Sequence, residues 1–112
     1  MTSLRSSGVL GPLATVSQAT DITTGVTIAA NYGQITTQAM AAAAAAEDTF
    51  TVTNSRVQAT SIVHVQIAST ASAGTPFAYV ASVAAGSFVI NITNFHATNA
   101  LDAAAVISFV VL

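Results

Sequence analysis

Charged side chains are the scarcest feature of this 112-residue chain. Lysine is absent, the two basic residues are Arg5 and Arg56, and charged residues make up 5% of the sequence, against about 25% in an ordinary soluble domain. Two arginines cannot form the basic stripe that phosphates require, so nucleic acid is not an expected partner. Because charge keeps monomers apart, and its depletion is typical of interface cores, we expect a subunit of a permanent assembly. The alternative is a small neutral protein that its hydroxyl groups keep soluble.

Cysteine is also absent. The chain can therefore form neither disulfides nor thiolate metal sites, and the sequence indicates no redox compartment. The longest apolar stretches, 39–46 and 103–112, fall well short of the roughly 20 residues that cross a bilayer, so no membrane is expected as a partner. The N-terminal "MTSLRSSGVLGPLATVSQA" has one arginine and a weak apolar run, interrupted by Gly11 and Pro12. This pattern favours an extended arm over a cleaved signal peptide.

The pattern that is present has period two and is rich in β-branched residues, which indicates β-strands. In 61–69, for example, Val63, Val65 and Ile67 alternate with His64 and Gln66. The C-terminal stretch 104–112 is apolar on both faces, as is typical of a strand paired inside a sheet. We predict no amphipathic helix, and strands at 22–30, 34–40, 49–54, 61–69, 77–83, 88–93 and 104–112.

Short, evenly spaced strands without an amphipathic helix predict an all-β fold, a sandwich or a barrel. We expect an antiparallel β-sandwich of about seven to eight strands. We assign residues 1–20 to an extended N-terminal arm and residues 21–112 to the sandwich domain. In strand 77–83 we expect Phe77, Tyr79 and Val83 on one face. Gly86 suits the positive φ of a tight connection. The candidate interaction residues are Leu4, Arg5, Val9, Leu10 and Leu13 of the arm, together with Arg56.

Six consecutive alanines, residues 41–46, interrupt the strand pattern. Alanine is the best helix former, but an isolated helix shorter than about 12–15 residues is marginal in water. No capping residue precedes the run, and Glu47 and Asp48 lie at its carbonyl end, where acids oppose the helix dipole. We therefore predict that 41–48 connects two strands and contains at most one helical turn.

Few residues could carry out chemistry. His64 is predicted on the polar face of a strand and His96 in the loop 94–103, where it packs beside Phe95 or hydrogen-bonds the turn. Neither has a metal-ligand partner nearby in sequence, and whether the two meet in the fold is open. Glu47 and Asp48 would point apart if extended, and we interpret them as a solvated turn. With no nucleophile–base pattern, phosphate loop or metal set, we expect neither an enzyme nor a cofactor.

Two segments share a similar order of residues. "FTVTNSRVQATSIV" (50–63) and "FVINITNFHATNALDAAAVI" (88–107) each begin in Phe, reach Thr-Asn and continue through a polar link into a β-branched strand. The similarity is consistent with a duplicated strand–loop–strand unit. It is equally consistent with chance, because β proteins in general reuse similar short strand and turn sequences.

The phrases "ATDITTGVTI", "GQITT", "DTFTVTNSRV", "GTPFAYVASVAAGSFVINITNFHATNAL" and "ISFVVL" resemble a family of small tailed-bacteriophage virion proteins, some of which are capsid decoration, or cement, proteins. The resemblance covers about residues 19–112. It implies a β-sandwich or jelly roll that self-associates, typically as a trimer, on the outer surface of an icosahedral head, where it bridges major capsid proteins. Similar proteins tend to have Gly and Ser where this chain has its alanine run, so the resemblance implies no shape for that loop.

Two other classes of function stay open. A phage fibre or appendage module that binds host-surface glycans would carry its site on loops and would use exposed aromatic and acidic side chains. Its candidate aromatics are Tyr32, Tyr79 and Phe95. A small secreted adhesin-like bacterial domain would require a cleaved N-terminus.

Overall fold

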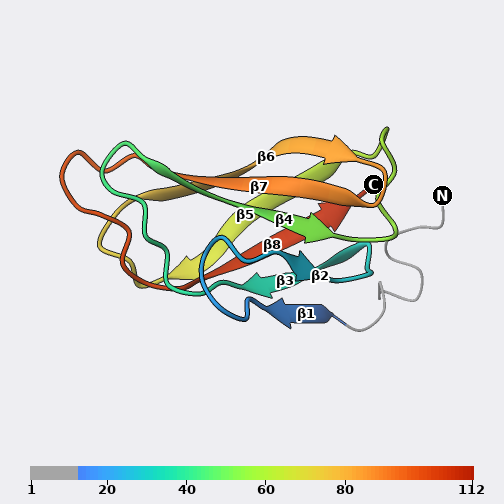
Figure 1. Cartoon of the computed structure of the whole chain (residues 1–112), viewed down its shortest axis with the longest axis horizontal. Coiled ribbons are helices and arrows are strands. Elements are labelled where there is room, and N and C mark those ends of the chain that lie inside the picture. Colours follow the sequence, from blue (N-terminus) through green and yellow to red (C-terminus); the bar gives the residue numbers. More distant parts are fainter. Residues whose placement is uncertain (1–12) are drawn as a thin grey trace.

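Eight β-strands and no helix make up residues 13–112, the part of the chain that the computed structural model describes (Figure 1). The all-β prediction is confirmed. The strands are β1 (Ala14–Ser17), β2 (Val26–Thr27), β3 (Tyr32–Thr36), β4 (Glu47–Thr53), β5 (Val63–Thr70), β6 (Pro76–Ala84), β7 (Ser87–Asn94) and β8 (Ala105–Val111).

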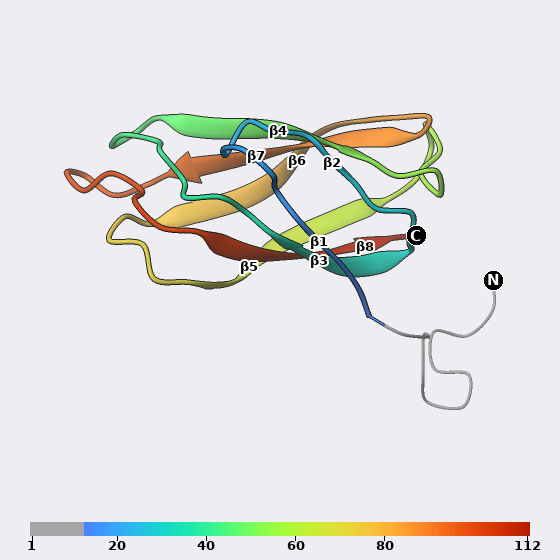
Figure 2. The ribbon, with the colours of Figure 1, turned by 60° about the horizontal axis from the view of Figure 1, so that its bottom comes forward.

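The strands form two four-stranded sheets that pack face to face (Figure 2). Sheet I has the order β1–β3–β8–β5, and sheet II has the order β2–β4–β7–β6. The β6–β7 hairpin joins neighbours within one sheet, whereas every other connection of the described chain crosses from one sheet to the other. The C-terminal strand β8 lies inside sheet I between β3 and β5, as its apolar sequence predicts.

Both sheets are mixed: most neighbouring strands are antiparallel, as predicted, but one edge pair of each sheet is parallel. β1 pairs with β3 in parallel, and β2 pairs with β4 in parallel, while the other neighbours are antiparallel. The cause is the alternation of the first four strands between the sheets. Each parallel pair is separated by one strand of the opposite sheet, which returns the chain to its starting end. Apolar and polar residues alternate in the same way in parallel and antiparallel strands, so the sequence pattern did not indicate these parallel pairs.

The N-terminal boundaries also differ from the prediction. Ala14–Ser17, which we assigned to the arm, is the edge strand β1, and the predicted strand 22–30 contributes only Val26–Thr27. The physical reason is the buried amide of Gln18, whose Nε2 donates to the carbonyls of Ile22 and Thr24, both at 2.9 Å. These bonds hold 18–24 as a loop around the side chain. β3 spans Tyr32–Thr36, so it begins two residues before the predicted strand 34–40 and ends four residues before the end of that prediction.

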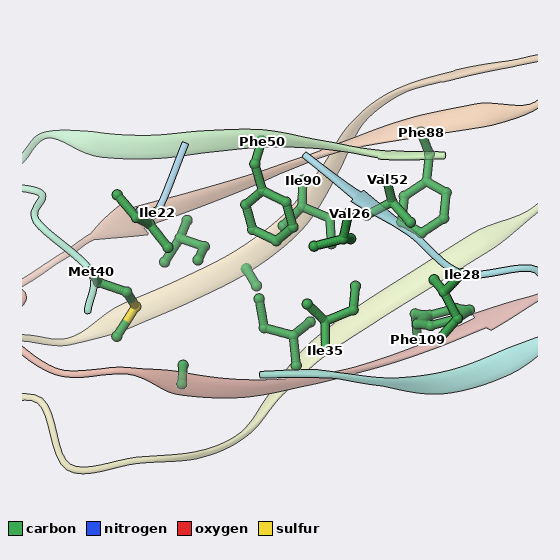
Figure 3. Packing of buried hydrophobic residues seen from close by; sticks show 14 of the residues in the cluster. Ile22, Val26, Ile28, Ile35, Met40, Phe50, Val52, Phe88, Ile90 and Phe109 are labelled. Carbon is green, nitrogen blue, oxygen red and sulfur yellow. The ribbon is translucent and has the colours of Figure 1, made fainter. Parts of the chain in front are cut away.

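The core lies between the two sheets and consists of their inward-facing aliphatic and aromatic side chains (Figure 3). β7 and β8 alternate strictly, and Phe88 of β7 meets Phe109 of β8 across the sandwich with ring centroids 5.9 Å apart. Each fully buried side chain of this size contributes roughly 1.5–3 kcal/mol. The fully buried hydrophobic members are Ile35, Met40, Phe88, Ile90, Ile92, Ile107 and Val52.

A β-bulge in β6 overturns the predicted face of that strand. The pairing with β7 shifts register between Val80 and Ser82. Phe77 and Tyr79 consequently point to solvent, whereas Val80 and Val83 pack against the core. A bulge places one extra residue in a strand and so reverses the faces beyond it.

The alanine run is a connection between β3 and β4, as predicted, and contains only a turn at residues 44–45. Ala45 has a φ of 63°, in the left-handed region that costs a non-glycine residue about 1–2 kcal/mol. Gly86 has a φ of 86° in the β6–β7 hairpin, in agreement with the prediction for that turn.

Asn94, at the end of β7, ties three loops together at one end of the sandwich, and its side chain is fully buried. Its Nδ2 donates to the carbonyls of Ala42 (3.3 Å), Ala43 (3.2 Å) and Asn99 (2.8 Å). Its Oδ1 accepts from the backbone N–H groups of Thr75 at 3.1 Å and His96 at 3.0 Å. One amide therefore holds the alanine loop, the β5–β6 loop and the β7–β8 loop.

Asn54 occupies the equivalent position in the first of the two similar segments. It is also fully buried, its Nδ2 donates to the Ala30 carbonyl at 2.7 Å, and its Oδ1 accepts from the Arg56 N–H two residues on. In both segments, a strand of sheet II leads through this turn into a strand of sheet I. The units also pair antiparallel with each other, β4 with β7 and β5 with β8. This arrangement gives the sequence similarity a structural counterpart.

Replacing Asn94 should destabilise the fold strongly. Asn94→Ala removes the five hydrogen bonds that join the three loops and leaves the N–H groups of Thr75 and His96 without this acceptor, so we expect the free energy of unfolding to fall by about 3 kcal/mol. Asn91→Ala, in the same strand but on the outer face, should cost less than about 1 kcal/mol. Urea unfolding of both variants measures the difference. Equal losses would contradict the role assigned to Asn94.

The left-handed backbone at Ala45 predicts a stabilising substitution. Ala45→Gly removes the Cβ conflict and should raise the free energy of unfolding by about 0.5–1 kcal/mol. Ala44→Gly is the matched control, because residue 44 has no positive φ. There, glycine should lower stability by about 0.5–1 kcal/mol through the entropy of the unfolded chain. Thermal unfolding of the pair tests the sign, and a loss in both variants would refute it.

Candidate interaction surfaces

Ionised side chains lie mainly in loops of the described chain. Asp21 is in the β1–β2 loop, Arg56 in the β4–β5 loop and Asp102 in the β7–β8 loop, while Glu47 and Asp48 begin β4. Hydrogen bonds from Thr23, first from its hydroxyl and then from its N–H, hold the pKa of the Asp21 carboxyl below its ordinary value. Asp21 therefore stabilises its own turn as a carboxylate.

The outer face of sheet I carries no Lys, Arg, Asp or Glu. Its central rung is Gln34–Ser108–Gln66, in which the Gln34 Nε2 donates to the Ser108 Oγ at 3.3 Å. The other outward positions of β3, β8 and β5 are small, neutral or aliphatic. A surface of this kind can be buried against protein without the desolvation cost of a charge. The remaining members of the face are Thr15, Ser17, Tyr32, Thr36, His64, Ala68, Ser69, Val106 and Val110.

The outer face of sheet II carries an aromatic strip, which we define as Phe77, Tyr79 and Phe95. The exposed fractions of these side chains are 52%, 37% and 65%, respectively. The rings of Phe77 and Tyr79 are nearly parallel, with centroids 6.1 Å apart, and the ring of Phe95 lies 5.8 Å from that of Phe77. Phe77 thus connects two residues that are 16 positions apart in sequence.

A polar cluster borders the aromatic strip. The Asn91 Nδ2 donates to the Tyr79 hydroxyl at 3.1 Å, and the Thr49 hydroxyl donates to the Asn91 Oδ1 at 2.7 Å. The Glu47 Oε2 accepts longer contacts of 3.4 Å from both Tyr79 and Asn91. Tyr79, Asn91 and Thr49 are direct cross-strand partners of β6, β7 and β4, so the sheet itself brings them together.

Sequence reasoning found only part of this site. Tyr79 and Phe95 were candidates, and the structure brings them together, but Tyr32 belongs to the opposite sheet. Phe77 and Asn91 were missed as site residues, because the expected face of β6 would have placed Phe77 with the core valine Val83. The bulge, which left no signal in the alternation pattern, is what places Val83 on the inner face while Phe77 points outward.

The predicted interaction residues do not form one described cluster. Leu4, Arg5, Val9 and Leu10 lie outside the described residues. Leu13 is half exposed directly before β1. Arg56 lies in an exposed loop, and its Nη1 donates to the Asn31 Oδ1 at 3.0 Å.

The two histidines lie at opposite ends of the sandwich. His64 is near the start of β5, paired with Val110 at the C-terminal end of β8, whereas His96 is in the loop before β8. The His96 Nδ1 accepts from the N–H groups of Thr98 (3.1 Å) and Asn99 (2.9 Å), so His96 hydrogen-bonds its turn, one of its two expected roles. Within residues 13–112, no group of three His, Asp or Glu side chains could hold a metal ion.

Glu47 and Asp48 form the first residues of β4, not a solvated turn, and point to opposite faces as adjacent strand residues must. Glu47 is exposed beside the aromatic strip. Asp48 is buried, and its Oδ2 accepts from the N–H groups of Ala41 at 3.0 Å and Ala42 at 3.1 Å. The two acids therefore have separate roles, one on the surface and one in anchoring the alanine loop.

Comparisons with protein-family models, curated proteins and solved structures found no match to this chain. Among the described residues, no helix is long and apolar enough to span a membrane.

The separate roles of the adjacent acids can be measured. Asp48→Ala removes two charge-assisted hydrogen bonds in a buried position and should lower the free energy of unfolding by about 2–3 kcal/mol. Glu47→Ala changes an exposed residue and should cost less than about 1 kcal/mol. Chemical denaturation at neutral pH compares them. A Glu47 variant that is as unstable as the Asp48 variant would contradict the assignment.

Proposed function

We propose that this protein is a structural subunit of a bacteriophage virion, a capsid decoration (cement) protein that self-associates, as a trimer, and bridges major capsid subunits on the outer surface of the head. The observation that carries this proposal is the outer face of sheet I, which has no Lys, Arg, Asp or Glu. The sequence resemblance to small phage virion proteins supports the same role. No catalytic activity is part of the proposal.

The physical basis is the low cost of burying the sheet I face. Its rungs present amides, hydroxyls and aliphatic groups, which can exchange hydrogen bonds with another neutral protein surface. Each contact is weak, but many copies on one head add their contributions through multivalency. We assign this face to contacts with the shell or with other copies, which leaves the aromatic strip of sheet II in solvent.

The alternative function is a fibre or appendage module that binds host-surface glycans. The observation that favours it is the aromatic strip with Glu47 at its border. Copy number separates the two functions, because a decoration protein is present in hundreds of copies per virion and a fibre module in a handful.

A charge inserted into the sheet I face tests the proposal. Gln66→Lys places an ammonium in the central rung, where burial against the shell would leave it unpaired, so occupancy of undecorated heads should fall at least about tenfold. Thr51→Lys on the outer face of sheet II is the matched control and should bind like the parent. Sedimentation of heads mixed with each purified variant measures occupancy. Full binding by Gln66→Lys, or a parent chain that never binds heads, would defeat the proposal.

The oligomeric state and the arm need separate measurements. A native mass spectrum of the purified chain at micromolar concentration should show trimers, and a lone monomer would count against self-association.

Deleting residues 2–12 tests the arm without removing β1, which belongs to sheet I. Unchanged binding of that deletion to heads would exclude a role for the arm.

A further inference from the structure

We propose that the aromatic strip and its polar border form a binding platform for a neutral, pyranose-containing glycan. The platform consists of the rings of Phe77, Tyr79 and Phe95 and the polar groups of Glu47 and Asn91. The inference does not depend on the capsid role, because sheet II would carry the platform in either of the functions considered above.

The rings supply the apolar half of sugar recognition. One face of a pyranose ring presents C–H groups, which pack favourably on the electron-rich face of an aromatic ring. Successive centroids lie 6.1 and 5.8 Å apart, a spacing comparable with the width of one sugar ring. The strip is thus suited to several consecutive units of a chain, and the exposed fraction of Phe95, 65%, leaves most of that ring available.

The polar border supplies acceptors and donors for sugar hydroxyls. A carboxylate can accept about four hydrogen bonds, and the Glu47 Oε2 receives only two long contacts, both 3.4 Å. These contacts are weak by the usual geometric standard, so a hydroxyl can displace them at little cost. Acids are depleted at the cores of protein–protein interfaces. Glu47, the one acid on the outer face of either sheet, lies directly beside the rings. Its position therefore favours a hydroxyl-rich ligand over a protein partner.

Charge defines the class of glycan. No Lys or Arg lies among the strip and its border, and Glu47 contributes one negative charge. A sialylated, uronic or phosphorylated sugar, and equally a nucleic acid whose bases could stack on the rings, would meet repulsion without a compensating cation. The ligand is therefore a neutral polysaccharide or the neutral part of a surface glycan.

The platform is held rigidly by the sheet. Tyr79 and Asn91 are cross-strand partners, and the Phe95 N–H donates to the Thr75 carbonyl at 2.9 Å. The preceding residue is the buried Asn94, which fixes the start of the loop. Little conformational entropy is lost on binding to a surface that is already ordered.

The test titrates the full chain with three neutral oligosaccharides, cellohexaose, laminarihexaose and maltohexaose, by isothermal calorimetry and by ¹H–¹⁵N NMR. At least one should bind, with shifts confined to β4, β6, β7 and Phe95. Phe77→Ala and Phe95→Ala should each weaken binding about tenfold. Glu47→Gln and Tyr79→Phe keep the shape of the platform and should weaken binding by a few fold. Ile62→Ala, an exposed apolar residue of the β4–β5 loop, is the control and should bind like the parent.

Several results would overturn the inference. These are no binding by the parent to any of the three probes, binding that Phe77→Ala and Phe95→Ala leave unchanged, or equal binding of an anionic heparin hexasaccharide. Loss of self-association in the two phenylalanine variants, with no sugar binding by the parent, would assign the strip to a second copy of the chain instead. The variants alter exposed side chains, so each one should fold. Their NMR spectra verify this.

Discussion

The buried amides of Asn54 and Asn94 are the interactions on which the architecture depends. Asn94 is the last residue of β7, and Asn54 directly follows β4. Each accepts a hydrogen bond from the N–H of the residue two positions on and donates to the carbonyl of a distant loop. A sandwich whose connections cross between sheets must satisfy many backbone groups where those connections leave the strands. Among residues 13–112, every buried side-chain nitrogen or oxygen has a hydrogen-bond partner. Neutral amides accomplish this without the desolvation cost of ion pairs.

The scarcity of charged side chains also determines the character of the outer faces of the two sheets. The Asp48 carboxylate is directed inward to the alanine loop, and Asp102 accepts hydrogen bonds from Ser72 and Ala73 of the neighbouring loop. Most of the few acids are thereby committed to holding loops. The two outer faces are left chemically distinct: the outer face of sheet I has no Lys, Arg, Asp or Glu, whereas that of sheet II bears aromatic rings beside its one acid, Glu47. We propose that the face of sheet I serves assembly and that the face of sheet II serves ligand recognition.

Much of the fold followed from local pattern, and the exceptions have physical causes. The alternation of Val63, Val65 and Ile67 with polar residues predicted a strand, and in β5 these three side chains pack against the core, because one face of each sheet must be buried. The alanine run was predicted to be a connection because no cap or large side chain supports a helix there. The bulge at Val80 left no comparable signal, so the outward direction of Phe77 was missed. The arm residues Leu4 and Arg5 lie outside the described part of the chain, and their role stays a prediction.

By itself, the sequence determined the all-β class, most strand positions, the turn at Gly86 and the poverty of charge, because these depend on properties of residues and their nearest neighbours. Tertiary structure alone decided which strands are neighbours, the parallel pairing of β1 with β3 and of β2 with β4, and the role of Asn94. It also decided that Phe77, Tyr79 and Phe95 meet beside Glu47. These features arise from contacts between segments far apart in the chain, and the energy of such contacts is set by the packing of the two sheets, which no local pattern encodes.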